Sequence, residues 1–294
     1  MKLELKGCGT AMVTPFFEDK SIDFEALKKH TEFLIQNGVD YLVVMGTTGE
    51  SVTLSRDEKQ RVLETVIEQN RNRLPIVMGA GGYHTQEICE SVQQLANYPI
   101  AAILSVTPYY NKPTQAGLIA HYKTIAQNTS FPIILYNVPG RTGVNLEAET
   151  TLTLAETEPN IVAVKEASGQ MNQIMRIIKH KPEHFQVISG DDAITLPLMA
   201  IGADGSISVI ANAFPKEFSM MIHAAQNGDF QTALNLHLYL LDFIQACFKE
   251  NSPAGIKALM SLKRQLQNVL RLPLIPVSKA LEQQLFALID EKMN

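Results

Sequence analysis

The sequence predicts an α/β fold, a (β/α)₈ TIM barrel followed by a C-terminal helical extension. Two observations predict it. Short, β-rich apolar runs recur at intervals of roughly 20–35 residues with amphipathic, helix-compatible segments between them, as in parallel strands joined by helices. Eight such units end near Asn212, and this number and length match one barrel.

Each predicted strand is a short apolar run that ends at polar or turn-forming residues. The first helix has a start signal at Asp23 and a stop signal at Asn37–Gly38. The second begins after Ser55 with acidic residues in its first turn, where the helix dipole favours negative charge. The predicted strands are Gly9–Thr14, Tyr41–Met45, Ile76–Gly79, Ala101–Thr107, Ile133–Tyr136, Ile161–Lys165, Gln186–Ser189 and Gly205–Val209.

The composition changes after about Pro215, where helical spacing continues without a strand pattern. We therefore expect a barrel over residues 1–225 that carries the active site, and a C-terminal helical region over residues 226–294. An apolar stripe in that region predicts either packing on the barrel wall or an oligomer interface. The stripe comprises Leu234, Leu238, Leu241 and Ile244.

The bulk composition is typical of a globular protein, with 46% hydrophobic and 19% charged residues. A net charge of -5 provides no positive field for nucleic acid. No stretch approaches the roughly 18 apolar residues of a membrane span, and the N-terminal residues lack the apolar core of a signal peptide. Three widely spaced cysteines fit a reducing compartment. We expect a cytoplasmic protein without nucleic-acid or membrane partners.

Neither a metal nor a cofactor is expected, because the seven histidines show no spacing typical of a metal site. The loop after the seventh strand, Gly190–Asp192, carries two acidic side chains where barrels of this kind often bind phosphate. Since like charges repel, a phosphate ester is not the expected substrate.

Lys165 ends the sixth predicted strand, and active sites of such barrels lie at the C-terminal ends of the strands. By alternation, Lys165 shares a face with Ile161 and Ala163 that is expected to point into the barrel mouth. Desolvation there favours a neutral amine, which attacks carbonyl carbons in lysine Schiff-base enzymes. The alternative is a structural lysine paired with a carboxylate.

The fifth predicted strand adds a phenol and an arginine. Tyr136 is expected to reach the mouth beside Lys165, where it is suited to relay the protons of imine formation. The Pro139–Gly140 turn presents Arg141 at the rim, where its planar guanidinium suits a carboxylate. Taken separately, a core tyrosine and a solvated arginine are the simpler interpretations.

Two further loops add polar groups to the same rim. Thr47 and Thr48 follow the second strand, at the start of a helix whose N–H groups suit a carboxylate. Tyr109 and Tyr110 follow the fourth strand. Each loop taken alone is weak evidence for a binding site.

Three segments, taken in order, closely resemble the dihydrodipicolinate synthase/N-acetylneuraminate lyase family of pyruvate-dependent class I aldolases. They are Gly46–Glu50, Tyr136–Gly143 and Val164–Gly169. The similarity runs from about Gly7 to Asn212 and continues more weakly through Leu270–Pro276. The Arg141–Gly143 ending is similar to the synthase branch rather than to the sugar-acid lyases.

The resemblance implies four catalytic residues. The match to Lys165 forms an imine with pyruvate. The matches to Tyr136, Thr47 and Tyr110 form a proton relay, and Tyr110 reaches in from a neighbouring subunit. A homo-oligomer, arranged as a dimer of dimers, is therefore the expected assembly.

The resemblance also implies the substrates. Thr48 and the backbone at Gly190 and Ile207 would line the pyruvate pocket, and Arg141 would guide the carboxylate of the second substrate. The implied reaction condenses pyruvate with L-aspartate 4-semialdehyde to 4-hydroxy-tetrahydrodipicolinate, in diaminopimelate and lysine biosynthesis. The alternative is a sibling pyruvate lyase acting on N-acetylneuraminate or a 2-keto-3-deoxy sugar acid. A non-catalytic sensor is disfavoured, because it need not retain a nucleophile with its relay.

A lysine-binding allosteric site of the family is only partly matched. Its positions in this chain are Ser51, Arg56, Tyr83, Glu87 and Tyr109. Inhibited members often carry histidine in place of Arg56 and asparagine in place of Tyr83. A cation at Arg56 would repel the ammonium groups of lysine, so weak or absent inhibition is expected. The segment Glu250–Lys257 departs from the family's usual proline-rich sequence, which leaves the packing of the tail helices open.

Overall fold

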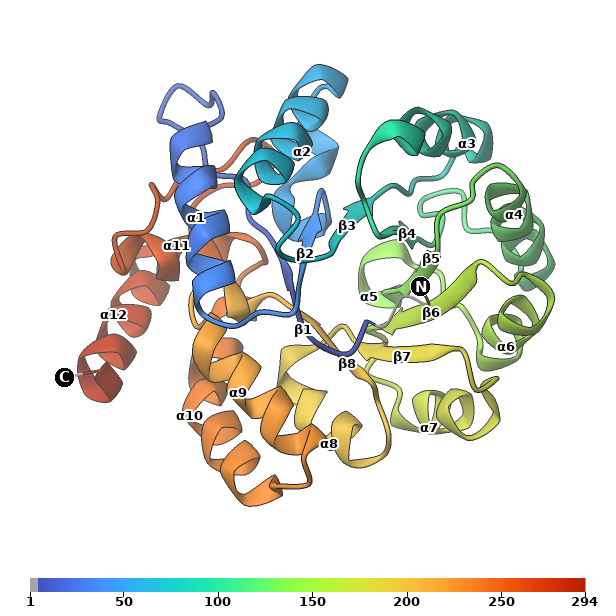
Figure 1. The fold of residues 1–294 in the computed structure, drawn as a ribbon. Helices are drawn as coiled ribbons and strands as arrows, with labels where there is room; N and C mark the ends of the chain where they lie inside the picture. The colour runs from blue at the N-terminus through green and yellow to red at the C-terminus, as the bar shows by residue number, and fades with distance from the viewer. Residues whose placement is uncertain (1–4, 294) are drawn as a thin grey trace. The chain divides into compact units, whose positions relative to one another are not determined.

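The computed structural model describes residues 5–293 and alternates strands with helices (Figure 1). In these residues the strands are β1 (Gly7–Ala11), β2 (Tyr41–Val44), β3 (Ile76–Gly79), β4 (Ala102–Val106), β5 (Ile133–Asn137), β6 (Ile161–Glu166), β7 (Gln186–Ser189) and β8 (Gly205–Ser208). They follow one another in sequence order around a closed barrel. The predicted (β/α)₈ fold is therefore confirmed.

The helices occupy the connections between strands and most of the tail (Figure 1). They are α1 (Phe24–Gln36), α2 (Arg56–Asn70), α3 (Thr85–Gln94), α4 (Gln115–Gln127), α5 (Pro139–Thr142), α6 (Ala148–Thr157), α7 (Met171–His180), α8 (Thr195–Ala200), α9 (Pro215–Gln226), α10 (Phe230–Phe248), α11 (Ala254–Leu262) and α12 (Lys279–Met293). Short 3₁₀ turns are η1 (Thr47–Gly49), η2 (Ser51–Thr53), η3 (Leu95–Asn97), η4 (Asp192–Ile194) and η5 (Ile210–Asn212).

The starts of the first two helices follow their predicted signals. Asp23 caps α1, since its side chain accepts a hydrogen bond from the backbone N–H of Ala26. Ser55 and Glu58 form a reciprocal capping box at the start of α2. Each such cap contributes about 1 kcal/mol, because it satisfies N–H groups that the helix itself leaves unpaired.

The chain folds as two compact units, which we describe separately. We name them by their place in the sequence: the central unit is built from its middle, Pro75–Ile207 with the residues up to Lys6, and the outer unit from the parts on either side, Gly7–Leu74 and Ser208–Asn294. The division predicted between residues 225 and 226 followed composition, whereas these units follow contacts. That predicted division stays a prediction.

The strand core of the central unit is apolar on both faces. Its strands pair in parallel, and residues of β4, β5 and β6 such as Ile103, Ile134 and Ala163 are fully buried. Burial of both faces is expected for parallel strands covered by crossover helices. This packing holds the C-terminal ends of β5 and β6 in a fixed register, which positions the side chains described below.

The first strand ends at Ala11 rather than at Thr14, so its predicted end was wrong. The side chain of Asn212 takes over from the strand ladder at this point. Its Oδ1 accepts from the N–H of Val13 at 3.1 Å, and its Nδ2 donates to the carbonyl of Ala11 at 2.8 Å. The first strand also begins two residues before the predicted Gly9, and each of the other predicted strand bounds agrees with the structure or differs by one residue.

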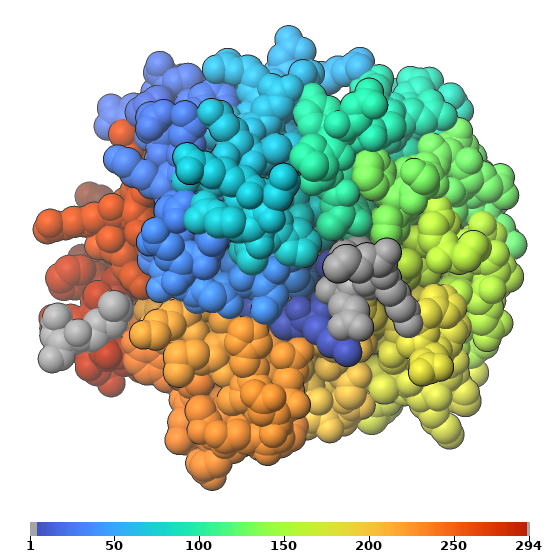
Figure 2. Space-filling view, viewed as in Figure 1, coloured from blue at the N-terminus to red at the C-terminus, as the bar shows by residue number. Residues whose placement is uncertain are grey.

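The predicted stripe on α10 is only partly buried. Leu234 and Leu238 are 41% and 53% exposed, whereas Ile244 is buried. The helix packs against α9, α11 and α12, so its buried face follows a different line of side chains. That line comprises Ala233, His237, Leu240, Phe243, Ile244, Ala246 and Cys247. The α9–α10 connection, in orange in Figure 2, lies at the surface, where residues 226–232 are exposed.

The structure bears on three points raised by the composition: the cysteines, membrane-spanning helices and metal sites. Cys8, Cys89 and Cys247 are buried free thiols. Among the helices of residues 5–293, none combines the length and the apolar character that a bilayer crossing needs. In the same residues, no group of three or more His, Cys, Asp or Glu side chains is placed to hold a metal ion.

Candidate active site

Lys165 lies at the C-terminal end of β6 and is almost completely buried, with 4% of its surface exposed. The strand register places it directly opposite Tyr136 of β5. Its Nζ lies 4.3 Å from the centroid of the Tyr136 ring. The ion pairs of the described residues do not include Lys165, so the alternative of a structural ion pair is not supported. The pair is a buried amine beside a phenol.

Gly190 leaves the space that the Lys165 side chain occupies. A Cβ added at Gly190 would lie 2.9 Å from Lys165 Cε and 2.8 Å from the Cβ of Ala167. Real Cβ contacts this short essentially never occur. The N–H of Gly190 donates to the carbonyl of Glu166 at 2.8 Å, which fixes the glycine at this distance. A glycine is therefore required beside the lysine, because its backbone approaches so closely.

Glu166 follows Lys165 but points to the opposite face of β6, and it is fully buried. Its Oε1 accepts from the backbone N–H of Ser168 at 2.8 Å and from Asn137 Nδ2 at 3.1 Å. Its Oε2 accepts from Gln173 Nε2 at 3.1 Å. These donors are amides, so the carboxylate is held by neutral groups that belong to the ends of β5, β6 and the start of α7.

The loop that carries Arg141 is fixed by the same group of residues. Asn137 Oδ1 accepts from the N–H of Leu146 at 2.9 Å. Thr142 Oγ1 contacts the carbonyls of Val138 and Val144 at 3.2 and 2.9 Å. The predicted Pro139–Gly140 turn is the first turn of the short helix α5, with proline where its missing N–H costs nothing. Arg141 is exposed on this helix.

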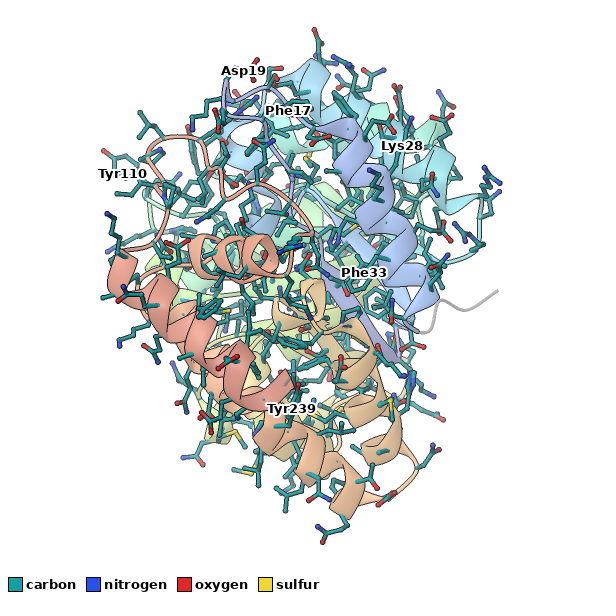
Figure 3. All side chains as sticks on the ribbon, turned by 90° about the vertical axis from the view of Figure 1, so that its left-hand side faces the viewer. Phe17, Asp19, Lys28, Phe33, Tyr110 and Tyr239 are labelled. Carbon is teal, nitrogen blue, oxygen red and sulfur yellow. The ribbon has the colours of Figure 1, made fainter. Side chains whose placement is uncertain are left out.

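Tyr110 lies on the surface of the protein, whereas Lys165 is buried. It is 90% exposed with a φ of +68°, and Figure 3 shows it at the periphery. The adjacent Tyr109 packs edge-on against Tyr83 at 5.2 Å between ring centroids. Asn111 Nδ2 donates to the carbonyl of Tyr83 at 3.3 Å. Burial raises the pKa of the Tyr109 phenol. The loop is thus braced through Tyr109 and Asn111, while Tyr110 projects outward.

Thr47 and Thr48 belong to the outer unit, in the 3₁₀ turn η1. Thr48 is 4% exposed, whereas Thr47 is exposed. A hydrogen bond from Thr14 Oγ1 to the carbonyl of Gly49, at 2.7 Å, holds the turn in place. The predicted donors are therefore present on an ordered turn at the end of β2.

The predicted site residues are divided between the two units. Those of the central unit are Lys165, Tyr136, Gly190, Ile207, Arg141, Tyr110, Tyr109, Tyr83 and Glu87. Those of the outer unit are Thr47, Thr48, Ser51 and Arg56. The structure brings Lys165, Tyr136 and Gly190 into contact, and Tyr83 and Tyr109 form a separate contact. The functional roles assigned to all of these residues stay predictions.

Sequence reasoning missed the buried polar groups that support these segments. Glu166 and Glu50 lie inside the recognised motifs, but we assigned them no role. Lys257 is the single charged residue of helix α11, which is otherwise built of apolar and small residues. A lone lysine in such a segment was a usable signal, since lysine is almost never fully buried unless it is paired.

Comparison with known proteins places this arrangement in a family. Residues 4–292 match the Dihydrodipicolinate synthetase family. A 4-hydroxy-tetrahydrodipicolinate synthase of Parabacteroides distasonis is 51% identical over 93% of this chain and 92% of its own length. The crystal structure of dihydrodipicolinate synthase from Aquifex aeolicus is 40% identical, with a TM-score of 0.95 over 98% of both chains.

A second solved structure is the chloride-inhibited dihydrodipicolinate synthase of Acinetobacter baumannii complexed with pyruvate. It is 38% identical to this chain, with a TM-score of 0.96, and the match covers 98% of this chain and 99% of the other. The family match spans nearly the whole sequence, and both structures share its fold. The chain therefore belongs to the dihydrodipicolinate synthetase family.

Proposed function

We propose that this chain condenses pyruvate with L-aspartate 4-semialdehyde to give 4-hydroxy-tetrahydrodipicolinate, through an imine on Lys165. The observation that carries the proposal is the buried Lys165 amine over the ring of Tyr136, on adjacent strands. Relatives with about half of their residues in common are named 4-hydroxy-tetrahydrodipicolinate synthase. The reaction belongs to the biosynthesis of diaminopimelate and lysine.

In the first half-reaction, Lys165 Nζ attacks the C2 carbonyl carbon of pyruvate, and loss of one water gives the imine. Removal of a proton from the pyruvate methyl group then gives an enamine. Lys165 is placed for this attack because its buried amine lies beside the Tyr136 ring. Tyr136, Thr47 and Tyr110 are proposed to move the protons that these steps require.

In the second half-reaction, the enamine carbon attacks the aldehyde carbon of the semialdehyde, whose oxygen takes a proton and becomes the 4-hydroxyl group. The amino group of the same substrate then attacks the imine carbon. This closes the ring and returns Lys165 as a free amine. One carbon–carbon bond and one carbon–nitrogen double bond are formed, and one water is released in total.

Four residues are proposed to bind the substrates. Thr48 and the backbone at Gly190 and Ile207 would line the pyruvate pocket, and Arg141 would pair with the carboxylate of the semialdehyde. The bracing of α5 through Thr142 supports this role for Arg141, because an ordered helix presents the guanidinium in a limited range of positions.

The test is pyruvate consumption with aspartate semialdehyde, beside N-acetylmannosamine and glyceraldehyde as competing acceptors. We expect turnover with the semialdehyde alone. Borohydride reduction in the presence of pyruvate is expected to add a lactyl group to Lys165, and Lys165→Ala is the control. Turnover with a sugar aldehyde alone would assign the chain the activity of the sibling pyruvate lyases instead. Absence of the lactyl group on Lys165 would contradict the imine mechanism.

We further propose a cytoplasmic homo-oligomer built as a dimer of dimers. The 90% exposure of Tyr110 supports this assembly, because a relay tyrosine must be covered to act near a buried lysine. One related solved structure is described as a monomeric dihydrodipicolinate synthase variant, so assembly differs among relatives. Mixing inactive Tyr110→Phe and Lys165→Ala protomers is expected to restore part of the activity if Tyr110 acts across an interface. No restoration would assign Tyr110 to its own chain.

Lysine inhibition is proposed to be weak or absent. Arg56 supplies a cation among the proposed allosteric positions, which also include Ser51, Tyr83, Glu87 and Tyr109. A related structure from Cyanidioschyzon merolae is described with lysine bound. Titration of the activity with lysine tests the proposal, and half-inhibition at submillimolar lysine would reject it.

A further inference from the structure

A buried ion-pair network lies directly behind the turn that carries Thr47 and Thr48. Glu50 follows this turn in a left-handed conformation, with φ of 53°, and joins η1 to η2. Its side chain and that of Lys257 in helix α11 are both fully buried and form an ion pair. The two residues are 207 positions apart in the sequence. The tail of the chain therefore reaches the active-site turn of its own unit.

Both oxygens of the Glu50 carboxylate are held by the tail. Lys257 Nζ donates to Oε1 and also to the carbonyl of Val269 at 2.9 Å. The backbone N–H of Arg271 donates to Oε2 at 3.1 Å. Lys257 Nζ also lies 4.2 Å from the centroid of the Phe16 ring, a cation–π contact. The carboxylate is thus fixed in direction as well as in place.

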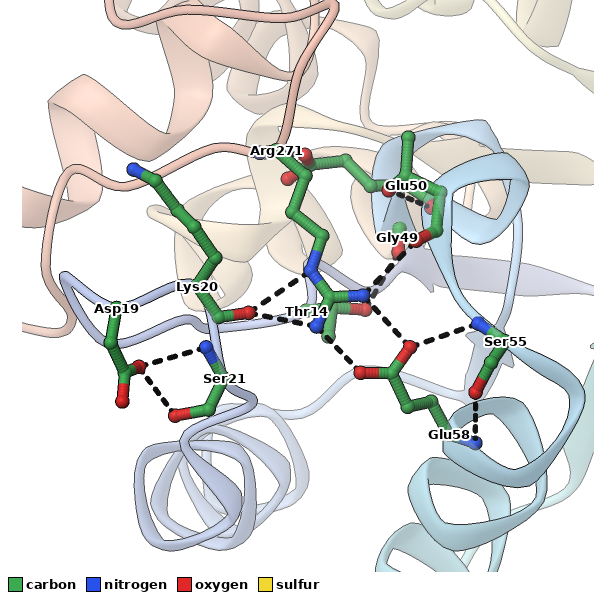
Figure 4. A network of polar contacts seen from close by, with 10 residues as sticks. Thr14, Asp19, Lys20, Ser21, Gly49, Glu50, Ser55, Glu58 and Arg271 are labelled. Atoms are coloured by element: carbon green, nitrogen blue, oxygen red, sulfur yellow. Dashed lines mark hydrogen bonds and ion pairs between the residues drawn. The ribbon is translucent and has the colours of Figure 1, made fainter.

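Arg271 holds the segment that follows this turn, and Figure 4 shows its guanidinium beside Glu58. Its guanidinium binds Glu58 through two nitrogens at 2.6 and 2.8 Å and donates to the carbonyl of Thr53 at 3.0 Å. Glu58 also caps α2 through Ser55. A planar fork on a carboxylate is a directional contact, so it sets the orientation of η2 and the start of α2 together.

The Glu50–Lys257 ion pair is better explained by the directed contacts it makes than by a gain in stability. A well-packed apolar pair in place of a buried ion pair is often as stable or more stable, because desolvation of the two ions is costly. Burial lowers the pKa of Lys257 to about 8 while Glu50 opposes the shift, so the ammonium group is kept at neutral pH. What the network supplies beyond burial is a pair of directed hydrogen bonds to the Glu50 carboxylate, two residues after Thr48. One comes from Lys257 Nζ and the other from the backbone N–H of Arg271.

We propose that Glu50, Lys257 and Arg271 are positioning residues, which hold the Thr47–Thr48 turn in the geometry needed for pyruvate binding and proton transfer. The inference rests on the proposed function, since the roles of Thr47 and Thr48 do. A displacement of about 1 Å in a reacting group lowers turnover on the order of 100-fold. Loss of the anchor therefore affects catalysis without any of these three residues touching the substrate.

The experiment uses the full-length protein and three test variants: Glu50→Gln, Lys257→Met and the double variant that combines them. Lys263→Met is the control variant. Lys263 is a matched control: it is the C-cap residue of α11, burial lowers its pKa to about 8, and its Nζ contacts Ala213 and Phe214 rather than the turn. The measurements are kcat, KM for pyruvate, thermal midpoint, and amide hydrogen exchange of residues 46–53.

We expect both single variants to lower kcat/KM for pyruvate on the order of 10–100-fold, with faster exchange in residues 46–53. The double variant is expected to recover its thermal midpoint but not its kinetics, because it removes the buried unpaired charge without restoring the directed hydrogen bonds. Lys263→Met is expected to keep the wild-type kcat and KM.

Three results would overturn the inference. The first is wild-type kinetics in Glu50→Gln, and the second is kinetics in the double variant that recover together with stability. Equal kinetic losses in Lys263→Met would also overturn it, since the effect would then follow general destabilisation. Wild-type protein is assayed in parallel. Absence of turnover and of borohydride labelling in the wild type would reject the proposed function itself, which distinguishes the two failures.

Discussion

The central and outer units each bury a glutamate directly behind a segment proposed to act in catalysis, and they satisfy it in different ways. Glu166, next to Lys165, accepts from Asn137, Gln173 and a backbone N–H, all within 29 residues in the sequence. Glu50, near Thr48, accepts from the ammonium of Lys257 and from the backbone of Arg271, 207 and 221 residues away.

The difference lies in what remains when one partner is removed. A neutral amide that is lost leaves the Glu166 carboxylate with several other donors. Loss of the Lys257 ammonium leaves the buried Glu50 carboxylate without its ion-pair partner, which is strongly unfavourable. Removal of one partner is therefore expected to cost the amide network only part of its stabilising effect, whereas it costs the ion-pair network nearly all of it. The predictions below test this contrast.

Lys257→Met is expected to produce the largest loss, about 3–5 kcal/mol in the free energy of unfolding. The reason is that Glu50 stays buried without its cation. Urea denaturation at neutral pH measures this value. Adding Glu50→Gln is expected to recover most of the loss, and a double variant no more stable than Lys257→Met would contradict the assignment to charge.

Acid is expected to destabilise both units through one buried histidine in each. Burial lowers the pKa of His30 in the outer unit and of His121 in the central unit to about 4. Between pH 6.5 and about 4 the unfolded chain binds protons that the folded chain does not, so stability falls as pH falls in this window. The loss reaches roughly 3 kcal/mol per histidine.

Unfolding of His30→Gln and His121→Gln across this pH range checks the prediction. Each variant is expected to remove about one proton from the pH dependence, which is about 1.4 kcal/mol per pH unit. An unchanged slope in both variants would assign the acid sensitivity to other groups.

Glu166→Gln is expected to cost about 2 kcal/mol, because an amide cannot accept all of the hydrogen bonds that the carboxylate accepts. The remaining donors limit the loss to less than that of Lys257→Met. Glu156→Gln, at an exposed position of α6 in the same unit, serves as the matched control and should change stability little. A loss in Glu166→Gln that equals the loss in Lys257→Met would erase the contrast.

Arg271→Lys is expected to show the smallest effect, about 1 kcal/mol, since lysine keeps the charge but loses the two-nitrogen contact with Glu58. The hydrogen bond from Arg271 lowers the pKa of Glu58 to about 2. This contribution is therefore complete above pH 4.5 and is lost as pH falls toward 2. A difference between wild type and variant that stays constant from pH 6 to pH 3 would count against this ion pair as its source.

Much of the fold and of the central pair could be predicted from the sequence, because the signals are local. Strand alternation placed Lys165 and Tyr136 on facing positions, and the structure confirms their contact. Capping signals at Asp23 and Ser55 placed the starts of α1 and α2 correctly. These features depend on residues a few positions apart, which a single sequence displays directly.

The remaining features depend on contacts between distant segments. The first strand ends early because of Asn212, some 200 residues away, and no local pattern announces that contact. Likewise, the buried face of α10 is selected by the helices that pack on it, so Leu234 and Leu238 stayed exposed despite their helical spacing. The partner of Glu50 was invisible for the same reason.

The distance along the chain between Glu50 and Lys257 also has a consequence during synthesis. Ribosomes add about 5–20 residues per second, so the 207 residues that separate the two partners take on the order of 10–40 s to make. Throughout that interval the turn behind β2 has its glutamate but not its cation. A nascent or prematurely ended chain that lacks α11 therefore carries every residue proposed for imine chemistry, yet we expect it to remain inactive until the last helices arrive.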